Sequence, residues 1–194
     1  MPAPIHRPRP NGRSYAAAST KRCGVSLALV EASATDLPAS LHGRFDMVYA
    51  TVGVLGWIED LEAWMRSVFA ALRPGGRLFL HELHPLYLTV ATVDPLTLDF
   101  PYAFDGPRAF DEDGSYADPS AKVEATKTIE FAHALGEVVT AAVGAGLVVD
   151  ALHEQLESDR EHRGGVLAPE PDGLYRMRIS AEVLPLLYTL LAHR

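Results

Sequence analysis

The spacing of hydrophobic residues changes along the chain, and three consecutive segments show this change most clearly. Residues 45–51 form a short apolar run rich in residues that favour strands. Residues 61–72 carry apolar side chains at helical spacing, and Asp60 before them is a suitable N-cap. Residues 73–76 (Arg-Pro-Gly-Gly) stop the helix, and residues 77–83 form a second apolar run. A strand, a helix and a strand of these lengths predict a right-handed βαβ unit in a parallel sheet.

Weaker patterns of the same kind lie on both sides of this unit. Further apolar runs predict strands at residues 26–31, 122–131, 147–152 and 184–191. Residues 134–145 have an apolar stripe at helical spacing, which predicts a second helix. Residues 86–120 are loop-like, with four prolines and six aromatic residues, and residues 160–173 are a polar loop. Alternating strands and helices indicate an α/β fold.

Composition narrows the class of protein. A chain of 194 residues with 48% hydrophobic and 22% charged residues is long enough for one globular domain with a real core. The only cysteine, Cys23, excludes an internal disulfide and fits a reducing compartment, so we expect a cytoplasmic protein. No apolar run is long enough for a membrane span, and the net charge of −8 argues against a nucleic-acid partner.

Basic residues gather at the start of the chain. Residues 1–25 hold five lysines and arginines, four prolines and no acid, and they lack apolar periodicity. We therefore expect a disordered basic arm there, followed by one folded domain over residues 26–194.

Three sequence motifs, in this order and spacing, are typical of one enzyme family. They are Glu31-Ala32-Ser33-Ala34-Thr35-Asp36-Leu37-Pro38, Phe45-Asp46-Met47-Val48 and Leu72-Arg73-Pro74-Gly75-Gly76-Arg77. Together they resemble the later half of the class I S-adenosylmethionine-dependent methyltransferase domain. The family's glycine-rich cofactor loop has no counterpart in residues 1–26.

The resemblance implies a fold and a ligand. The fold would be an incomplete Rossmann-like sheet, with counterparts of the family's strands 3-4-5-7-6 and helices on both faces. The cofactor would be S-adenosylmethionine, and its expected contacts are Ser33, Ala34, Ala50, Thr51, Val52 and Gly53. Residues 86–120 would be an insertion that covers a small-molecule substrate.

Candidate catalytic residues lie at the end of the strand over residues 77–83. Glu82 and His84 share a face by the alternation of a strand, so they could polarise or deprotonate a substrate nucleophile. For His84 the alternative is a buried structural histidine. His133 could face the same cleft. The string His81-Glu82-Leu83-His84 is one residue short of a helical zinc motif and lies on a strand, so we expect no metal.

Two functions remain open at this point. One is methyl transfer from S-adenosylmethionine to a small molecule. The other is a non-catalytic, truncated remnant or interaction module that cannot bind the cofactor. A sheet without the family's first two strands would have an open edge. This predicts that the strand over residues 26–31 pairs directly with the strand over residues 45–51, or that another chain fills the gap, as in a homodimer through this edge.

Overall fold

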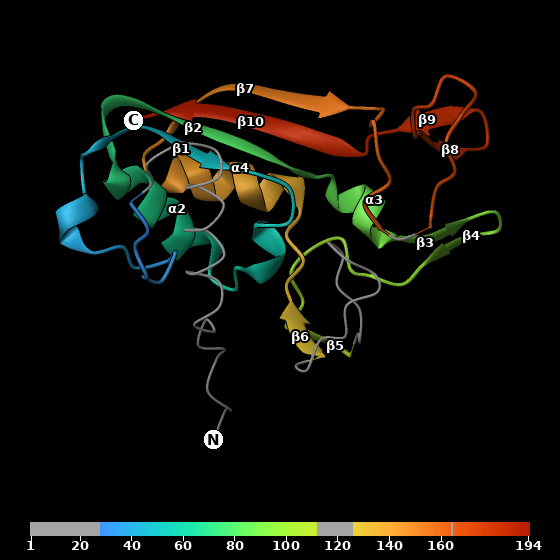
Figure 1. Cartoon of the computed structure of the whole chain (residues 1–194), viewed down its shortest axis with the longest axis horizontal. Coiled ribbons are helices and arrows are strands. Elements are labelled where there is room, and N and C mark those ends of the chain that lie inside the picture. The colour runs from blue at the N-terminus through green and yellow to red at the C-terminus, as the bar shows by residue number, and fades with distance from the viewer. Residues whose placement is uncertain (1–27, 112–125, 164) are drawn as a thin grey trace. The chain divides into compact units, whose positions relative to one another are not determined.

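A computed structural model describes residues 28–111, 126–163 and 165–194, and the chain divides into two compact units, residues 1–33 and 34–194. The larger unit is built on a four-stranded sheet whose strands are β1 (Phe45–Ala50), β2 (Leu72–Leu83), β7 (Val148–Gln155) and β10 (Leu187–His193). Their order is β1-β2-β10-β7. Strands β1 and β2 are parallel, and β10 is antiparallel to both of its neighbours (Figure 1). These strands are the expected counterparts of family strands 4-5-7-6.

The βαβ unit forms as the sequence predicts. Helix α2 (Leu61–Ala71) begins after Asp60, whose carboxylate accepts a hydrogen bond of 2.8 Å from the Ala63 N–H. After the helix, the pairing of β1 with β2 jumps from Phe45–Leu72 to Met47–Arg77, so residues 73–76 bulge out of the ladder. Gly76 lies in this bulge, where an added Cβ would be 2.8 Å from the Phe45 carbonyl oxygen. The predicted turn is therefore an irregularity at the start of β2, and it requires glycine.

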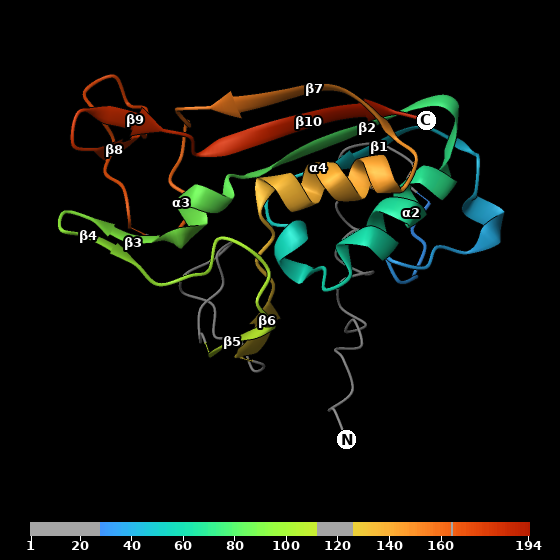
Figure 2. The ribbon, with the colours of Figure 1, turned by 180° about the vertical axis from the view of Figure 1, so that it is seen from behind.

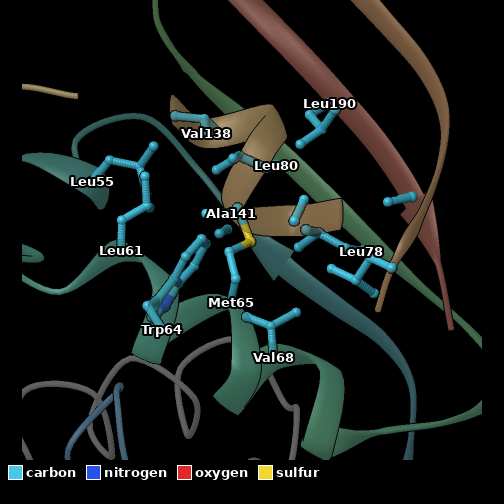
Figure 3. Close-up of a cluster of buried hydrophobic side chains, with 14 of the residues drawn as sticks. Leu55, Leu61, Trp64, Met65, Val68, Leu78, Leu80, Val138, Ala141 and Leu190 are labelled. Atoms are coloured by element: carbon cyan, nitrogen blue, oxygen red, sulfur yellow. The ribbon is translucent and has the colours of Figure 1, made fainter. Parts of the chain in front are cut away.

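One hydrophobic core lies between the sheet and its two long helices. Helix α4 (Leu135–Gly144) packs beside α2. Figure 3 shows side chains of both helices meeting those of β2 and β10, and the fully or nearly fully buried members include Met65, Leu78, Leu80, Val138 and Leu190. Burial of one such side chain stabilises the fold by about 1.5–3 kcal/mol, so this cluster is a main source of stability.

Both long helices cover the same face of the sheet, and the two views agree on this (Figures 1 and 2). The family resemblance implied helices on both faces of the sheet. In the described part of the chain, the long helices cover one face only. On the other face, Met47 and Tyr49 of β1 are 54% and 66% exposed, and Tyr49 stacks on Phe79 with ring centroids 5.2 Å apart.

The predicted strand over residues 26–31 does not join the sheet in the described part of the chain. Residues 28–31 have no strand pairing, and Val30 is 54% exposed. Residues 26 and 27, like the basic arm over residues 1–25, lie outside the described residues. A short apolar run favours an extended backbone, but it forms a strand only when a neighbour supplies hydrogen bonds.

Shorter elements complete the larger unit. They are the single turns η1 (Ala39–Leu41) and η2 (Leu55–Trp57), helix α3 (Pro85–Thr89), and three two-stranded ladders: β3 (Val90–Val93) with β4 (Leu96–Leu98), β5 (Arg108–Asp111) with β6 (Lys127–Glu130), and β8 (Met177–Ile179) with β9 (Glu182–Leu184). Residues 122–125 of the predicted strand over residues 122–131 lie outside the described residues, and within the rest β6 pairs with β5 and not with the main sheet. Residues 86–111 contain more regular structure than a loop-like segment was expected to have.

Candidate functional site

An open cavity of about 1330 Å³ lies at the carboxyl end of the parallel strands. Its lining includes Thr51, Val52 and Gly53, which follow β1, and His81, Glu82 and Leu83, which end β2. Open α/β sheets bind their ligands at this edge. The volume exceeds that of an ordinary small-molecule pocket, so it can hold two ligands side by side.

One wall of the cavity is formed by residues 51–57 together with Glu82, and we call it the strand wall. Glu82 is 4% exposed, and its carboxylate accepts from three backbone N–H groups: Gly53 at 2.6 Å, Leu83 at 2.8 Å and Leu55 at 3.1 Å. A buried carboxylate is stable only when such donors satisfy it. Glu82 therefore fixes the backbone of the loop that follows β1.

The facing wall is formed by residues 158–163, and we call it the loop wall. The Tyr87 hydroxyl, buried under this loop, donates to Glu161 at 2.5 Å. Glu161 in turn accepts from the Arg163 N–H at 2.9 Å, and the Arg163 guanidinium donates to the carbonyls of Tyr87 and Val90. Burial, with Glu161 adding to it, raises the pKa of Tyr87, so the hydroxyl keeps its proton and remains a donor.

Three histidines line the cavity: His81, His133 and His162. His133 donates from Nε2 to the Ile58 carbonyl at 2.6 Å and stacks on Phe104. His81 Nδ1 lies 2.9 Å from the Thr189 hydroxyl, and His162 Nε2 lies 3.1 Å from the Ser158 hydroxyl. Burial is the largest influence on the pKa of His162 and lowers it, and the Arg160 charge lowers it further.

His84 lies elsewhere. Its Nδ1 accepts from the Leu86 N–H at 3.1 Å and so caps α3, while its Nε2 is 2.9 Å from a carboxylate oxygen of Glu154. The described lining of the cavity includes Glu82 and His133 but not His84, so His84 and His133 do not share it. Burial lowers the pKa of His84, with Glu154 opposing this shift. Nδ1 thus has a structural partner, and Nε2 lies beside a carboxylate without a hydrogen bond of good geometry.

Comparison with protein families gives one match. Residues 8–80 match the model of a methyltransferase domain, and the match starts upstream of Glu31, the first residue of the three sequence motifs. No curated protein matches the sequence.

Several solved structures with a similar fold are described as S-adenosylmethionine-dependent methyltransferases. An S-adenosylmethionine-dependent methyltransferase from Mesorhizobium loti matches with a TM-score of 0.59 and 21% identity, over 92% of this chain and 75% of its own. One from Clostridium acetobutylicum matches with a TM-score of 0.59 and 13% identity, over 95% and 72%. The chain has the methyltransferase fold. The glycopeptide N-methyltransferase MtfA, in its complex with S-adenosyl-L-homocysteine, shares this fold with a TM-score of 0.52 and 15% identity, over 93% and 68%.

The methyltransferase resemblance named six cofactor contacts, and the structure brings three of them together. Thr51, Val52 and Gly53 line the cavity. Ala50 is 6% exposed and belongs to the hydrophobic core, and Ala34 is exposed and outside the described lining. Ser33 is exposed and belongs to the smaller compact unit, residues 1–33. Binding by these residues stays a prediction.

Several lining residues escaped the sequence reasoning. Trp57 lines the cavity and is 57% exposed. Its place beside Gly56, in a turn instead of a helix, was the available signal. Ser158 and His162 had no such signal, because their pairing depends on how a polar loop folds. No three His, Cys, Asp or Glu side chains converge as metal ligands in the described ranges, and no helix described there is both long and apolar enough to cross a bilayer.

Proposed function

We propose that this chain binds S-adenosylmethionine in the cavity and transfers its methyl group to a small molecule. The observation that carries the proposal is the position of the cavity, at the carboxyl end of β1 and β2 in a methyltransferase fold, with the loop after β1 held rigidly by Glu82. Methyl transfer by in-line displacement depends mostly on proximity and orientation, which a fixed backbone provides.

The charge of the lining supports a cationic ligand. The lining contains six carboxylates (Glu82, Asp99, Glu130, Glu157, Asp159 and Glu161) against two guanidinium groups (Arg160 and Arg163). S-adenosylmethionine carries a positive sulfonium, so a net negative cavity attracts it. The exposed indole of Trp57 adds an aromatic face that favours cations.

The same cavity explains where a small acceptor would sit. Asp99, Phe100 and Phe110 of the segment after α3 contribute to the lining. This placement supports the role of residues 86–120 as a substrate-covering insertion. Glu82 and His84 remain candidate catalytic residues, although the hydrogen bonds that each residue makes favour a supporting role.

A non-catalytic chain is the second candidate function. It is favoured by β1 being the edge of the sheet in the described part of the chain, with Met47 and Tyr49 exposed beside it. Open edges pair readily with other chains, so a homodimer through β1 is part of this alternative. We place either form of the protein in the cytoplasm, with no nucleic-acid partner, on the basis of Cys23 and the net charge of −8.

Calorimetric titration of the purified chain with S-adenosylmethionine separates the two candidates. Micromolar binding supports the methyltransferase, and a folded chain that gives no heat up to millimolar ligand supports the alternative. The variant Val52→Arg places a cation in the strand wall and should abolish binding. Its matched control is Val143→Arg, at a residue of α4 that is 57% exposed and outside the described lining.

Sedimentation of the same samples tests the edge. If β1 pairs with a second copy, the wild-type chain sediments as a dimer and Tyr49→Lys as a monomer. A wild-type monomer at high micromolar concentration contradicts the homodimer.

A further inference from the structure

The loop wall holds a serine and histidine pair that neither the fold nor the sequence motifs account for. Ser158 is 8% exposed, and its hydroxyl oxygen lies 3.1 Å from His162 Nε2. The same oxygen accepts from the Arg160 N–H at 3.3 Å. A backbone N–H of the same loop therefore holds the Ser158 hydroxyl, and this hydroxyl in turn orients the His162 ring.

The loop that carries this pair is rigidly supported. The Tyr87 hydroxyl and the Arg163 guanidinium attach it to α3 and β3, and the backbone of Ser158 is hydrogen-bonded in both directions to Tyr175. A reacting group must be held within about 0.5 Å of its productive position, and support of this kind provides it.

The other two histidines of the cavity are paired with groups from distant parts of the chain. His133 is buried and uses its Nε2 proton on the Ile58 carbonyl. His81 Nδ1 faces the Thr189 hydroxyl, which also accepts from the Gln155 side-chain amide at 2.9 Å. His162, like His81, has a hydroxyl as its partner, but this hydroxyl belongs to the same loop four residues before it. A hydroxyl can accept from Nε2–H and leave Nδ1 as a base.

The charges around His162 favour its neutral form. Arg160, Glu161 and Asp159 face it from its own loop, and His81 faces it from β2. Burial and the Arg160 cation lower its pKa, while the two carboxylates oppose this. An imidazole that is neutral at pH 7 is ready to accept a proton.

We propose that His162 is the proton acceptor for methyl transfer in this cavity, with Ser158 positioning its ring, and that the methyl acceptor is an O–H or N–H group. The inference rests on the proposed function. The acceptor's lone pair forms the new bond to the methyl carbon, and the sulfur–methyl bond breaks with its electron pair moving to sulfur, which gives S-adenosylhomocysteine. The acceptor's proton moves to Nδ1 of His162 and then to solvent.

An NMR titration of the histidine rings tests this without a known acceptor. The chain is saturated with S-adenosylmethionine or with S-adenosylhomocysteine, and the ring signal missing from His162→Gln identifies His162. If His162 lies close to the reacting sulfur, the sulfonium charge lowers its pKa relative to the neutral sulfide complex by about half a pH unit or more. The ring signal of His193, at the end of β10 away from the cavity and paired with Asp150, is the control and should not differ between the two complexes.

Each result decides something different. Equal pKa values for His162 in the two complexes, with both ligands bound by calorimetry, overturn the inference and leave the proposed function intact. No binding of either ligand overturns the proposed function itself and the inference with it. In Ser158→Ala the difference between the complexes should shrink, because the ring loses its partner; an unchanged difference removes Ser158 from the proposal.

Discussion

The two walls of the cavity are built by opposite means. The strand wall is held by one buried carboxylate, Glu82, that gathers the backbone N–H groups of the loop after β1. The loop wall is held by side chains from another part of the chain, Tyr87 and Arg163, while its backbone carries Ser158 and His162 into the cavity. The first arrangement fixes a surface for a ligand, and the second fixes reactive groups. The difference implies that the strand wall governs stability and binding together, and the loop wall governs chemistry.

Removing the carboxylate of Glu82 should have the largest effect. Glu82→Ala leaves three N–H groups without their acceptor, and we expect the free energy of unfolding to fall by about 3 kcal/mol or more. Urea unfolding followed by circular dichroism measures this. Glu82→Gln keeps the shape and one acceptor oxygen, so it should lose less. The control Glu62→Ala removes an exposed carboxylate paired with Arg66 at 3.5 Å and should change stability by no more than about 0.5 kcal/mol.

A substitution at Gly76, in the irregularity at the start of β2, should lower the free energy of unfolding by nearly as much. In Gly76→Ala the new methyl group would meet the carbonyl oxygens of Phe45 and Arg73 at 2.8 and 2.9 Å, both of them backbone atoms. We expect a loss of about 2 kcal/mol in the free energy of unfolding, because β1 and β2 must shift apart. Gly136→Ala in α4 meets nothing within 4 Å and should be stabilising, since alanine favours a helix. Equal effects of the two substitutions would show that the bulge tolerates a side chain.

The same contrast between the two walls separates what could be predicted from the sequence from what could not. The β1–α2–β2 unit was predictable because Asp60, the apolar stripe and the Pro-Gly-Gly stop are local signals. The place of β10 between β2 and β7 followed from the family resemblance. The pairing of β6 with β5 did not, since alternation marks a strand but not its partner. Likewise Thr51, Val52 and Gly53 were foreseen from their place after a strand.

The loop wall was beyond sequence reasoning for a physical reason. Tyr87 and Glu161 are 74 residues apart, and no periodicity connects them. For His84 the sequence left open a role in the cleft and a buried structural role, and the catalytic role stays a prediction. Its position along the strand was right, but α3 begins there and takes its Nδ1 as a cap, and Glu154 on β7 lies against its Nε2.

Weakening the attachment of the loop wall should lower the free energy of unfolding by less than Glu82→Ala or Gly76→Ala does. Tyr87→Phe removes the hydroxyl that donates to Glu161 at 2.5 Å and keeps the buried ring. We expect the free energy of unfolding to fall by about 1–1.5 kcal/mol, with faster amide hydrogen exchange confined to residues 158–163. Tyr49→Phe, at a tyrosine that is 66% exposed, is the control and should change neither quantity. Exchange that speeds up equally across the main sheet would mean that the hydroxyl supports the whole domain.

The smallest expected effect concerns pH and His84, which belongs to neither wall. Burial lowers the pKa of His84 below its ordinary value of 6.5, and Glu154 only partly offsets this. The unfolded chain therefore binds a proton more readily than the folded one as pH falls through 6.5, and the free energy of unfolding falls with it, at most by about 1.4 kcal/mol per pH unit. The lowered pKa of His162 likewise reduces the free energy of unfolding as pH falls. The lowered pKa values of Glu170 and Asp172 reduce it only below pH 4.5.

Urea unfolding at pH 7.5 and 5.5 checks this prediction. The wild-type chain should be less stable at pH 5.5, and His84→Gln should lose part of that difference, because glutamine does not titrate. His153→Gln, at an exposed histidine of β7, should behave like the wild type. If His84→Gln keeps the full difference, Glu154 balances the burial of the imidazole, and the ring is as easily protonated in the folded chain as in the unfolded one. His84 would then be a charged partner of β7 as well as the cap of α3.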